Sequence, residues 1–236
     1  MQQAYIVKAY RSAVGRAKKG GFRFYRSDDI ASDVIKHLMA QVPDLDPNLV
    51  DDIIVGCANP EGEQGLQIGR QIALQAIGKE VPGMTINRYC ASGVETISIA
   101  AAKINAGMGE VYLAGGAESM SMIPMTGYKL APNYRFANKT PEYLVGMGLT
   151  AEAVANKYGI SREAQDEFAV RSHVLAAKAH EAGYLPAEMV EVNLPPKFKV
   201  INRDNGIRGN STVEKVSRLR PAFDKKFGTL TAANSS

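Results

Sequence analysis

The first half of the sequence alternates between two kinds of hydrophobic pattern, and this alternation constrains the fold more than any other feature. Short apolar runs typical of buried strands occupy 4–9, 53–57, 84–86 and 111–116. Apolar residues at helical spacing occupy the intervening segments 30–39, 66–77 and 91–106. A strand and helix order repeated in this way predicts an α/β fold with a mostly parallel sheet and helices on both of its faces.

The third helical segment combines small and apolar residues. Four of its apolar residues share one face: Val94, Ile97, Ala101 and Ile104. Gly107 follows this face and is expected to end the helix, because glycine readily adopts the left-handed conformation found at helix C-termini.

The pattern changes after Met120. Residues 121–147 contain Met, Tyr, Pro and Gly without clear periodicity, which is long for a structureless connection and indicates a functional insertion. Helical spacing returns after Thr150 and again after Ser161, and the second of these helices is expected to end at Gly183.

The formal charge of +4 is unevenly distributed. Residues 1–121 contain 12 Lys and Arg against 13 Asp and Glu, whereas residues 122–236 contain 16 against 11. The basic residues do not form a compact run with interleaved aromatics, so nucleic acid is not expected to be a partner. A small anionic ligand rich in phosphate would suit this charge, and surface lysines that serve solubility are the alternative.

The sequence contains no signal for a membrane or for secretion. No apolar run approaches the roughly 20 residues that span a bilayer, and residues 1–8 lack the basic start and long apolar stretch of a secretion signal. We therefore expect a cytoplasmic protein without a membrane span. The two cysteines, Cys57 and Cys90, are too few for a disulfide framework and should be free thiols in a reducing compartment.

Cys90 lies between a predicted strand and a predicted helix. Open α/β folds bind ligands at the carboxyl ends of their strands, and a helix N-terminus favours a thiolate. Cys90 is therefore a candidate nucleophile, and a buried structural thiol is the alternative. Cys57 ends a predicted strand and is expected to be a packing residue.

The three histidines do not indicate a metal site. His37 is alone on its predicted helix, and His173 and His180 are seven residues apart on another. This arrangement lacks the closer spacing and the carboxylate partners of zinc hydrolases, so we expect no metal ion.

Several segments together resemble the thiolase family. Residues 86–97, Ile-Asn-Arg-Tyr-Cys-Ala-Ser-Gly-Val-Glu-Thr-Ile, are similar to the acyl-enzyme signature of thiolases, and residues 115–121, Gly-Gly-Ala-Glu-Ser-Met-Ser, are similar to the segment that follows it. Further similar segments lie at 147–152, 165–169, 219–224 and 228–234. They span nearly the whole chain in the family's order, which makes the resemblance specific.

The resemblance implies a five-layered αβαβα fold, built from two similar halves with a covering loop domain inserted in the first. Mapped onto this chain, residues 1–121 would be the N-terminal α/β domain and residues 122–230 the loop domain, which binds coenzyme A. Residues 231–236 would begin the return to the first domain. The basic balance of the second half suits the phosphates of coenzyme A.

The resemblance also implies a chemistry. An acyl group would pass between Cys90 and coenzyme A, with coenzyme A and acyl-CoA as substrates and no tightly bound cofactor. By similarity, Met147 is expected to line the pantetheine channel. Arg220 and Ser236 are expected to lie near the body of coenzyme A.

Three further thiolase motifs do not occur in this sequence: an Asn-Glu-Ala-Phe-type segment, a Gly-His-Pro histidine and a second cysteine in a Cys-x-Gly segment. The histidine activates the nucleophile, and the second cysteine acts as acid and base at the carbon that is deprotonated. We therefore expect the chain to lack the C-terminal half and to be inactive alone. The family also implies a homodimer or a dimer of dimers, paired through the strand near 84–87.

Within the family, the resemblance favours a degradative 3-ketoacyl-CoA thiolase of fatty acid β-oxidation. Acetoacetyl-CoA thiolases typically have His at the position of Gly146, so glycine there favours a longer-chain substrate. Acetyl-CoA acetyltransferase is the alternative enzyme, and a decarboxylating ketoacyl synthase fits the loop-domain segments less well. A non-catalytic fragment that binds coenzyme A or supports assembly is the alternative outside enzymes.

Overall fold

A computed structural model describes residues 2–197 and 199–235. They divide into two compact units: unit 1 comprises Met1–Leu130 and Pro186–Gly206, and unit 2 comprises Ala131–Leu185 and Ile207–Ser236. The segment Pro186–Gly206 therefore belongs to unit 1, although it lies inside the predicted loop domain 122–230.

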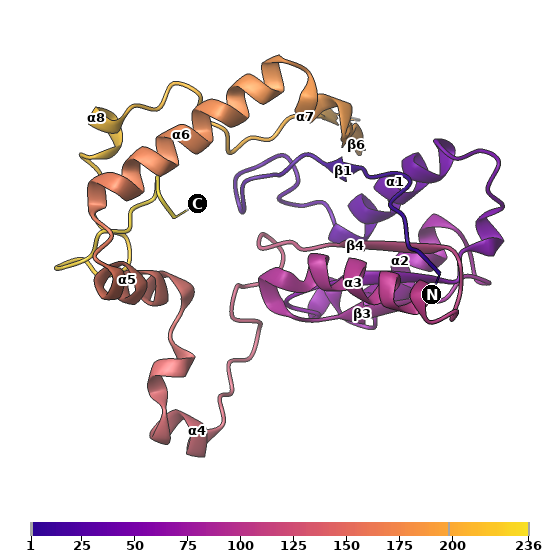
Figure 1. The fold of residues 1–236 in the computed structure, drawn as a ribbon, viewed down its shortest axis with the longest axis horizontal. Helices are drawn as coiled ribbons and strands as arrows, with labels where there is room; N and C mark the ends of the chain where they lie inside the picture. The colour runs from indigo at the N-terminus through magenta and orange to yellow at the C-terminus, as the bar shows by residue number, and fades with distance from the viewer. Residues whose placement is uncertain (1, 198, 236) are drawn as a thin grey trace. The chain divides into compact units, whose positions relative to one another are not determined.

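The centre of unit 1 is a sheet of parallel strands in the order β3-β2-β4 (Figure 1). Its strands are β2 Asp52–Gly56, β3 Gly83–Ile86 and β4 Tyr112–Gly116. The register places Gly56 opposite both Ile86 and Gly116, so all three strands end at the same level. Every residue of β2 is buried because this strand has a neighbour on each side and helices over both faces.

Two helices cover this sheet, α2 Ile68–Ala76 and α3 Ser92–Asn105, and α1 Ser27–Ala40 packs on α2. Successive residues of β2 point to opposite faces. Ile53 and Val55 belong to the hydrophobic core that includes α2, whereas Gly56 contacts Ser92 at the start of α3. The α/β fold with a parallel sheet and helices on both faces, as predicted from the alternating pattern, is confirmed.

One predicted strand is wrong. Residues 4–9 do not form a strand, and Tyr5, Ile6 and Val7 are each about three quarters exposed. An apolar run becomes a strand only when a neighbouring strand satisfies its backbone groups. Within residues 2–197 and 199–235, none of the strands pairs with 4–9, so this segment stays irregular.

The apolar face of α3 is not its fully buried face. Val94 and Ile97 are exposed, Ala101 and Ile104 are half-buried, and the buried residues of α3 are Ser92, Thr96 and Ala100. Spaced four apart, these small side chains let the helix backbone lie close to β2. Short side chains rather than large apolar ones therefore set this contact.

The rest of unit 1 consists of short elements. The strand pair β1 Arg11–Ser12 and β5 Met189–Val190 is parallel, and the pair β6 Val192–Leu194 and β7 Lys199–Ile201 is antiparallel. One-turn helices lie at η1 Pro47–Leu49, η2 Gly62–Gln64 and η3 Tyr89–Ala91. Arg11 ties the two ends of unit 1 together through a two-pronged ion pair with Asp204 at 2.9 and 3.0 Å.

Unit 2 is mainly helical. Its longer helices are α5 Met147–Tyr158 and α6 Arg162–Glu181, and its shorter ones are α4 Tyr134–Lys139, η4 Pro141–Leu144 and α8 Val213–Val216. A further short helix, α7 Tyr184–Ala187, lies where the chain returns to unit 1. The predicted ends of α6 are confirmed, because the Ser161 hydroxyl accepts from the Ala164 N–H and Gly183 follows with φ of +83°.

None of the helices in the described part of the chain is both long and apolar enough to cross a bilayer.

Candidate active site

Cys90 lies in the turn η3, between the end of β3 and the start of α3, and its side chain is exposed. The turn is tight, because Tyr89 adopts a left-handed conformation with φ of +46°, which is uncommon for a residue other than glycine. The Asn87 Oδ1 accepts from the Tyr89 N–H at 2.8 Å, an Asx-type turn that favours this conformation. The sequence therefore places the Cys90 thiol beyond the sheet, directly ahead of a helix.

Ser92 fixes the same turn from the other side. Its hydroxyl donates to the Tyr89 carbonyl at 2.7 Å and accepts from the Arg88 N–H at 2.8 Å. Ser92 also packs on Gly56, where a Cβ atom would lie only 2.7 to 2.9 Å from Ser92 atoms. Glycine at the end of β2 is thus needed for α3 and the cysteine turn to approach the sheet this closely.

Polar contacts join the turn to the carboxyl ends of the other two strands. The Asn87 side-chain amide donates to the Ala58 carbonyl at 2.9 Å, and the Ala58 N–H donates to the Glu118 carboxylate at 2.6 Å. Ala58 follows β2 and Glu118 follows β4, so residues after all three strands share one chain of hydrogen bonds. Gln64, which is fully buried, adds contacts to Glu118 and to the Ser119 N–H.

Cys57 lies at the end of β2, is 1% exposed and belongs to the hydrophobic core, as predicted for a packing residue. Its sulfur lies 3.4 Å from the Gln64 amide nitrogen and 4.0 Å from a Glu118 oxygen. Burial, and next the negative charge of Glu118, raise the pKa of the Cys57 thiol to about 12. This thiol stays protonated near neutral pH and is a poor nucleophile.

The sequence analysis proposed a role for Cys90 but none for Asn87, Gln64 and Glu118. Asn87 and Glu118 come shortly after buried strands, and Gln64 lies between β2 and α2. Their positions were the available signal, because the carboxyl ends of parallel strands meet at one edge of a sheet.

Of the candidate coenzyme A contacts, Met147 and Arg220 belong to unit 2, and Ser236 lies outside the described residues. Met147 is the first residue of α5 and is 70% exposed, and Arg220 is exposed in the segment after α8. The structure brings these two segments together, because the backbone of Gly148 packs directly on the ring of Phe223 and leaves no room for a side chain.

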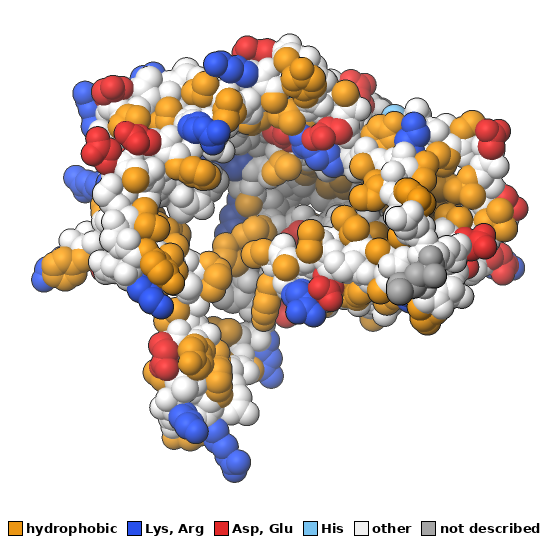
Figure 2. Space-filling view, in the orientation of Figure 1, with side chains coloured by type: hydrophobic (Ala, Val, Ile, Leu, Met, Phe, Trp, Pro, Cys, Tyr) orange, Lys and Arg blue, Asp and Glu red, His pale blue; other side chains and the backbone are white. Residues whose placement is uncertain are grey.

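The surface of unit 2 is mixed in character. On the face shown in Figure 2, acidic and basic side chains are interspersed over α6, and hydrophobic side chains gather over α4. The exposed aromatic residues of this region are Tyr134, Phe136 and Tyr143. The basic excess of the second half is therefore not gathered over α6 on this face.

Within residues 2–197 and 199–235, no three His, Cys, Asp or Glu side chains lie together in a way that could hold a metal ion. Unit 1 presents an exposed thiol at a strand-to-helix turn, whose backbone is fixed by Asn87 and Ser92.

The sequence comparisons agree with this arrangement. Residues 4–236 match the family model described as thiolase, N-terminal domain. The chain belongs to the thiolase family. It is 46% identical over 248 residues to a 3-ketoacyl-CoA thiolase of Bacillus subtilis, an alignment that covers all of this chain and 63% of that relative.

Other relatives give the same result. A 3-ketoacyl-CoA thiolase of Saccharophagus degradans is 42% identical over 238 residues, covering 98% of this chain and 60% of the relative. A 3-ketoacyl-CoA thiolase of Marinobacter nauticus is 41% identical over 237 residues, with the same coverage. The chain thus spans about three fifths of the length of the curated relatives that it matches.

Proposed function

We propose that the protein containing this chain is a 3-ketoacyl-CoA thiolase, an acyltransferase that cleaves 3-ketoacyl-CoA with free coenzyme A in fatty acid β-oxidation. The observation that carries the proposal is the exposed Cys90 at the turn between β3 and α3. It is supported by relatives that bear this enzyme's name and align over nearly all of the chain.

In the proposed reaction the Cys90 thiolate attacks the 3-keto carbonyl carbon of the substrate. The bond between C2 and C3 then breaks, the shortened acyl group stays on the Cys90 sulfur as a thioester, and C2 takes up a proton to give acetyl-CoA. The thiol of a second coenzyme A loses its proton and attacks the thioester, which releases acyl-CoA and restores the cysteine. Asn87 and Ser92 hold the turn so that the sulfur is presented beyond the sheet.

Met147, Arg220 and Ser236 are proposed as the coenzyme A contacts, with residues 1–121 as the α/β domain, 122–230 as the loop domain and 231–236 as the start of the return. Met147 offers an exposed apolar side chain to pantetheine, and Arg220 an exposed guanidinium to phosphate. The proton transfers would need groups outside this sequence, so we propose that the chain alone does not turn over.

The test uses acylation of the thiol. We expect the protein, extended to the full length of its relatives, to gain one acyl group from acetyl-CoA on the peptide that contains Cys90, as measured by mass spectrometry. Cys90→Ser should abolish the adduct and lower turnover by roughly a thousandfold or more, because a serine hydroxyl is a far poorer nucleophile at this pH. Cys57→Ser is the matched control and should retain the adduct.

An adduct on Cys57, or turnover that survives Cys90→Ser, would exclude Cys90 as the nucleophile. The chain length of accepted substrates separates the proposed enzyme from an acetyl-CoA acetyltransferase, which would prefer acetoacetyl-CoA. Gly146, the N-cap residue directly before α5, supports the longer-chain substrate. Binding of coenzyme A without any adduct would instead indicate a non-catalytic binding fragment.

We further propose a cytoplasmic homodimer, or a dimer of dimers, paired through β3. In the described residues β3 lies at one edge of the sheet and is only half-buried, so its outer side is available for pairing. Light scattering of the full-length protein at micromolar concentration should give at least twice the monomer mass. A monomer under these conditions would contradict this assembly.

A further inference from the structure

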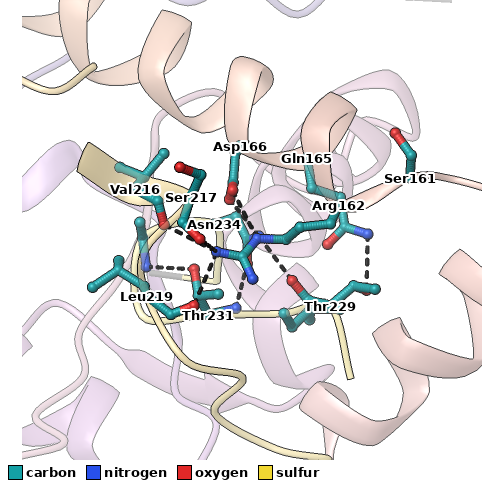
Figure 3. Close-up of polar contacts among 12 residues, drawn as sticks. Ser161, Arg162, Gln165, Asp166, Val216, Ser217, Leu219, Thr229, Thr231 and Asn234 are labelled. Atoms are coloured by element: carbon teal, nitrogen blue, oxygen red, sulfur yellow. Dashed lines mark hydrogen bonds and ion pairs between the residues drawn. The ribbon is translucent and has the colours of Figure 1, made fainter. Parts of the chain in front are cut away.

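An ion pair with a buried carboxylate lies on one side of α6 in unit 2. The Asp166 side chain is 1% exposed, and the half-buried Arg162 one turn earlier donates from its Nε to the Asp166 Oδ2 at 2.7 Å (Figure 3). Because Asp166 is withdrawn from water, its carboxylate must keep its hydrogen bonds, and this fixes the geometry of the groups around it.

Arg162 also contacts a second chain segment through one of its two terminal nitrogens. Its terminal nitrogen Nη2 donates to the carbonyls of Val216, Ser217 and Leu219 at 2.9, 3.3 and 3.1 Å. These residues end α8 and lead directly to Arg220. The guanidinium therefore fixes the backbone immediately before a proposed coenzyme A contact.

Asp166 holds a second segment that is distant in sequence. Its Oδ1 accepts from the Asn234 side-chain amide at 3.0 Å, and Asn234 in turn accepts from the Thr231 N–H at 2.7 Å and donates to the Thr229 carbonyl at 3.2 Å. Figure 3 shows Asn234 and Arg162 converging on the same carboxylate. Asn234 stands two positions before Ser236 in the sequence.

The same segment is bound to α5, the helix that begins with Met147. The Glu152 carboxylate accepts from the N–H groups of Thr229 and Leu230 at 2.8 and 3.0 Å, and from the Thr229 hydroxyl at 3.0 Å. Gln165 of α6 donates to that hydroxyl at 3.0 Å. One polar network thus connects α5, which begins at Met147, with the segment that leads to Arg220 and with residues 229–234.

We propose that Arg162 and Asp166 act as a positioning pair, which sets the segments 216–220 and 229–234 in one arrangement so that the proposed coenzyme A contacts act together. The proposal rests on the function proposed above. Neither residue is assigned a contact with the ligand, so both act through the segments that they hold.

Asp166→Asn tests the pair without changing its size. Both neighbours of the carboxylate are donors, so one of them would face the new NH2 group and lose its acceptor, and the other would lose the negative charge that strengthens its hydrogen bond. We expect hydrogen exchange, measured by mass spectrometry on this chain, to become at least about tenfold faster in both 216–220 and 229–234. Glu167→Gln removes the same charge from an exposed neighbour on α6 and should change neither segment.

Faster exchange in only one of the two segments, or in neither, would overturn the proposal. If Asp166→Asn does not fold, as judged by circular dichroism, Arg162→Lys provides the test. Lysine keeps a positive charge beside Asp166 but lacks the planar fork that reaches the three carbonyls. Exchange in 216–220 should then rise, and unchanged exchange there would refute the positioning role.

Coenzyme A binding, measured by calorimetry on this chain, tests the functional part. In the unchanged chain, Asp166→Asn should weaken binding by at least about tenfold. In a chain that already carries Arg220→Ala, the same substitution should weaken binding by less than about threefold, because the pair acts through Arg220. An equal loss in both backgrounds would mean a general structural effect and would refute the proposal. Absence of coenzyme A binding by the unchanged chain would count against the proposed function, while the exchange result would still decide the positioning role.

Discussion

The two cysteines of unit 1 lie after neighbouring parallel strands and have opposite surroundings. Cys57 comes one residue after β2, and its N–H still donates to the Ile86 carbonyl of β3 at 3.0 Å, so its side chain remains in the core. Cys90 comes four residues after the end of β3, where the chain has already left the sheet. A cysteine directly after its strand is therefore a packing residue, whereas a cysteine three residues further beyond its strand end is accessible.

The largest consequence of this difference should be chemical reactivity. With limiting iodoacetamide near neutral pH, we expect Cys90 to be alkylated at least about 100 times faster than Cys57, because Cys57 is buried and its pKa is raised to about 12. Peptide mapping of the folded chain measures both rates. Cys57→Ala should leave the labelling unchanged and Cys90→Ala should remove most of it, whereas preferential labelling of Cys57 would reverse the comparison.

A smaller effect is expected at Gly56, which precedes Cys57 and contacts the helix that follows Cys90. Gly56→Ala places a Cβ atom against Ser92, and we expect a loss of about 1 to 3 kcal/mol in the free energy of unfolding. Gly115→Ala in β4 is the control, because a Cβ atom there meets no atom within 4 Å. Equal unfolding free energies for the two variants, measured with urea, would show that the contact of Gly56 with α3 tolerates a side chain.

The smallest effect concerns stability in alkali. The folded protein keeps the Cys57 thiol protonated up to about pH 12, whereas the unfolded chain ionises it near pH 9, so its contribution to stability is lost as the pH rises between these values. At pH 10, one unit above the pKa of the unfolded chain, we expect this loss to be on the order of 1 kcal/mol. The pKa of Tyr25 is also raised to about 12 by burial, so the effect of Cys57 is the difference between the unchanged protein and Cys57→Ala. Identical pH profiles of unfolding would contradict it.

The sequence predicted those parts of the fold that depend on local pattern. The strands β2, β3 and β4 were recognisable because a buried strand flanked by helices is apolar along its length. Residues 4–9 have the same composition but form no strand, since pairing depends on a neighbour that a local pattern does not reveal. Hydrophobic periodicity does not reveal the contact face of α3, because Ser92, Thr96 and Ala100 are small rather than strongly apolar.

The candidate site divides in the same way. The position of Cys90 followed from the order of strand, turn and helix. The link from Asn87 through Ala58 to Glu118 depends on the register of three strand ends, and the contacts of Arg162 and Asp166 join residues more than 50 positions apart. Such contacts are set by three-dimensional packing, so no spacing rule in the sequence would have found them.

The strand order of unit 1 also has a consequence for how the chain matures on the ribosome. The central strand β2 is made first, and its partners β3 and β4 follow, so the whole sheet with the Cys90 turn has been synthesised by Gly116. The partner of β1, by contrast, is β5 at Met189–Val190, which is translated only after residues 131–185 of unit 2. Synthesis from the N-terminus therefore lets the sheet assemble early. The pairing of β1 with β5 must wait until the residues that follow 131–185 in the sequence have been made.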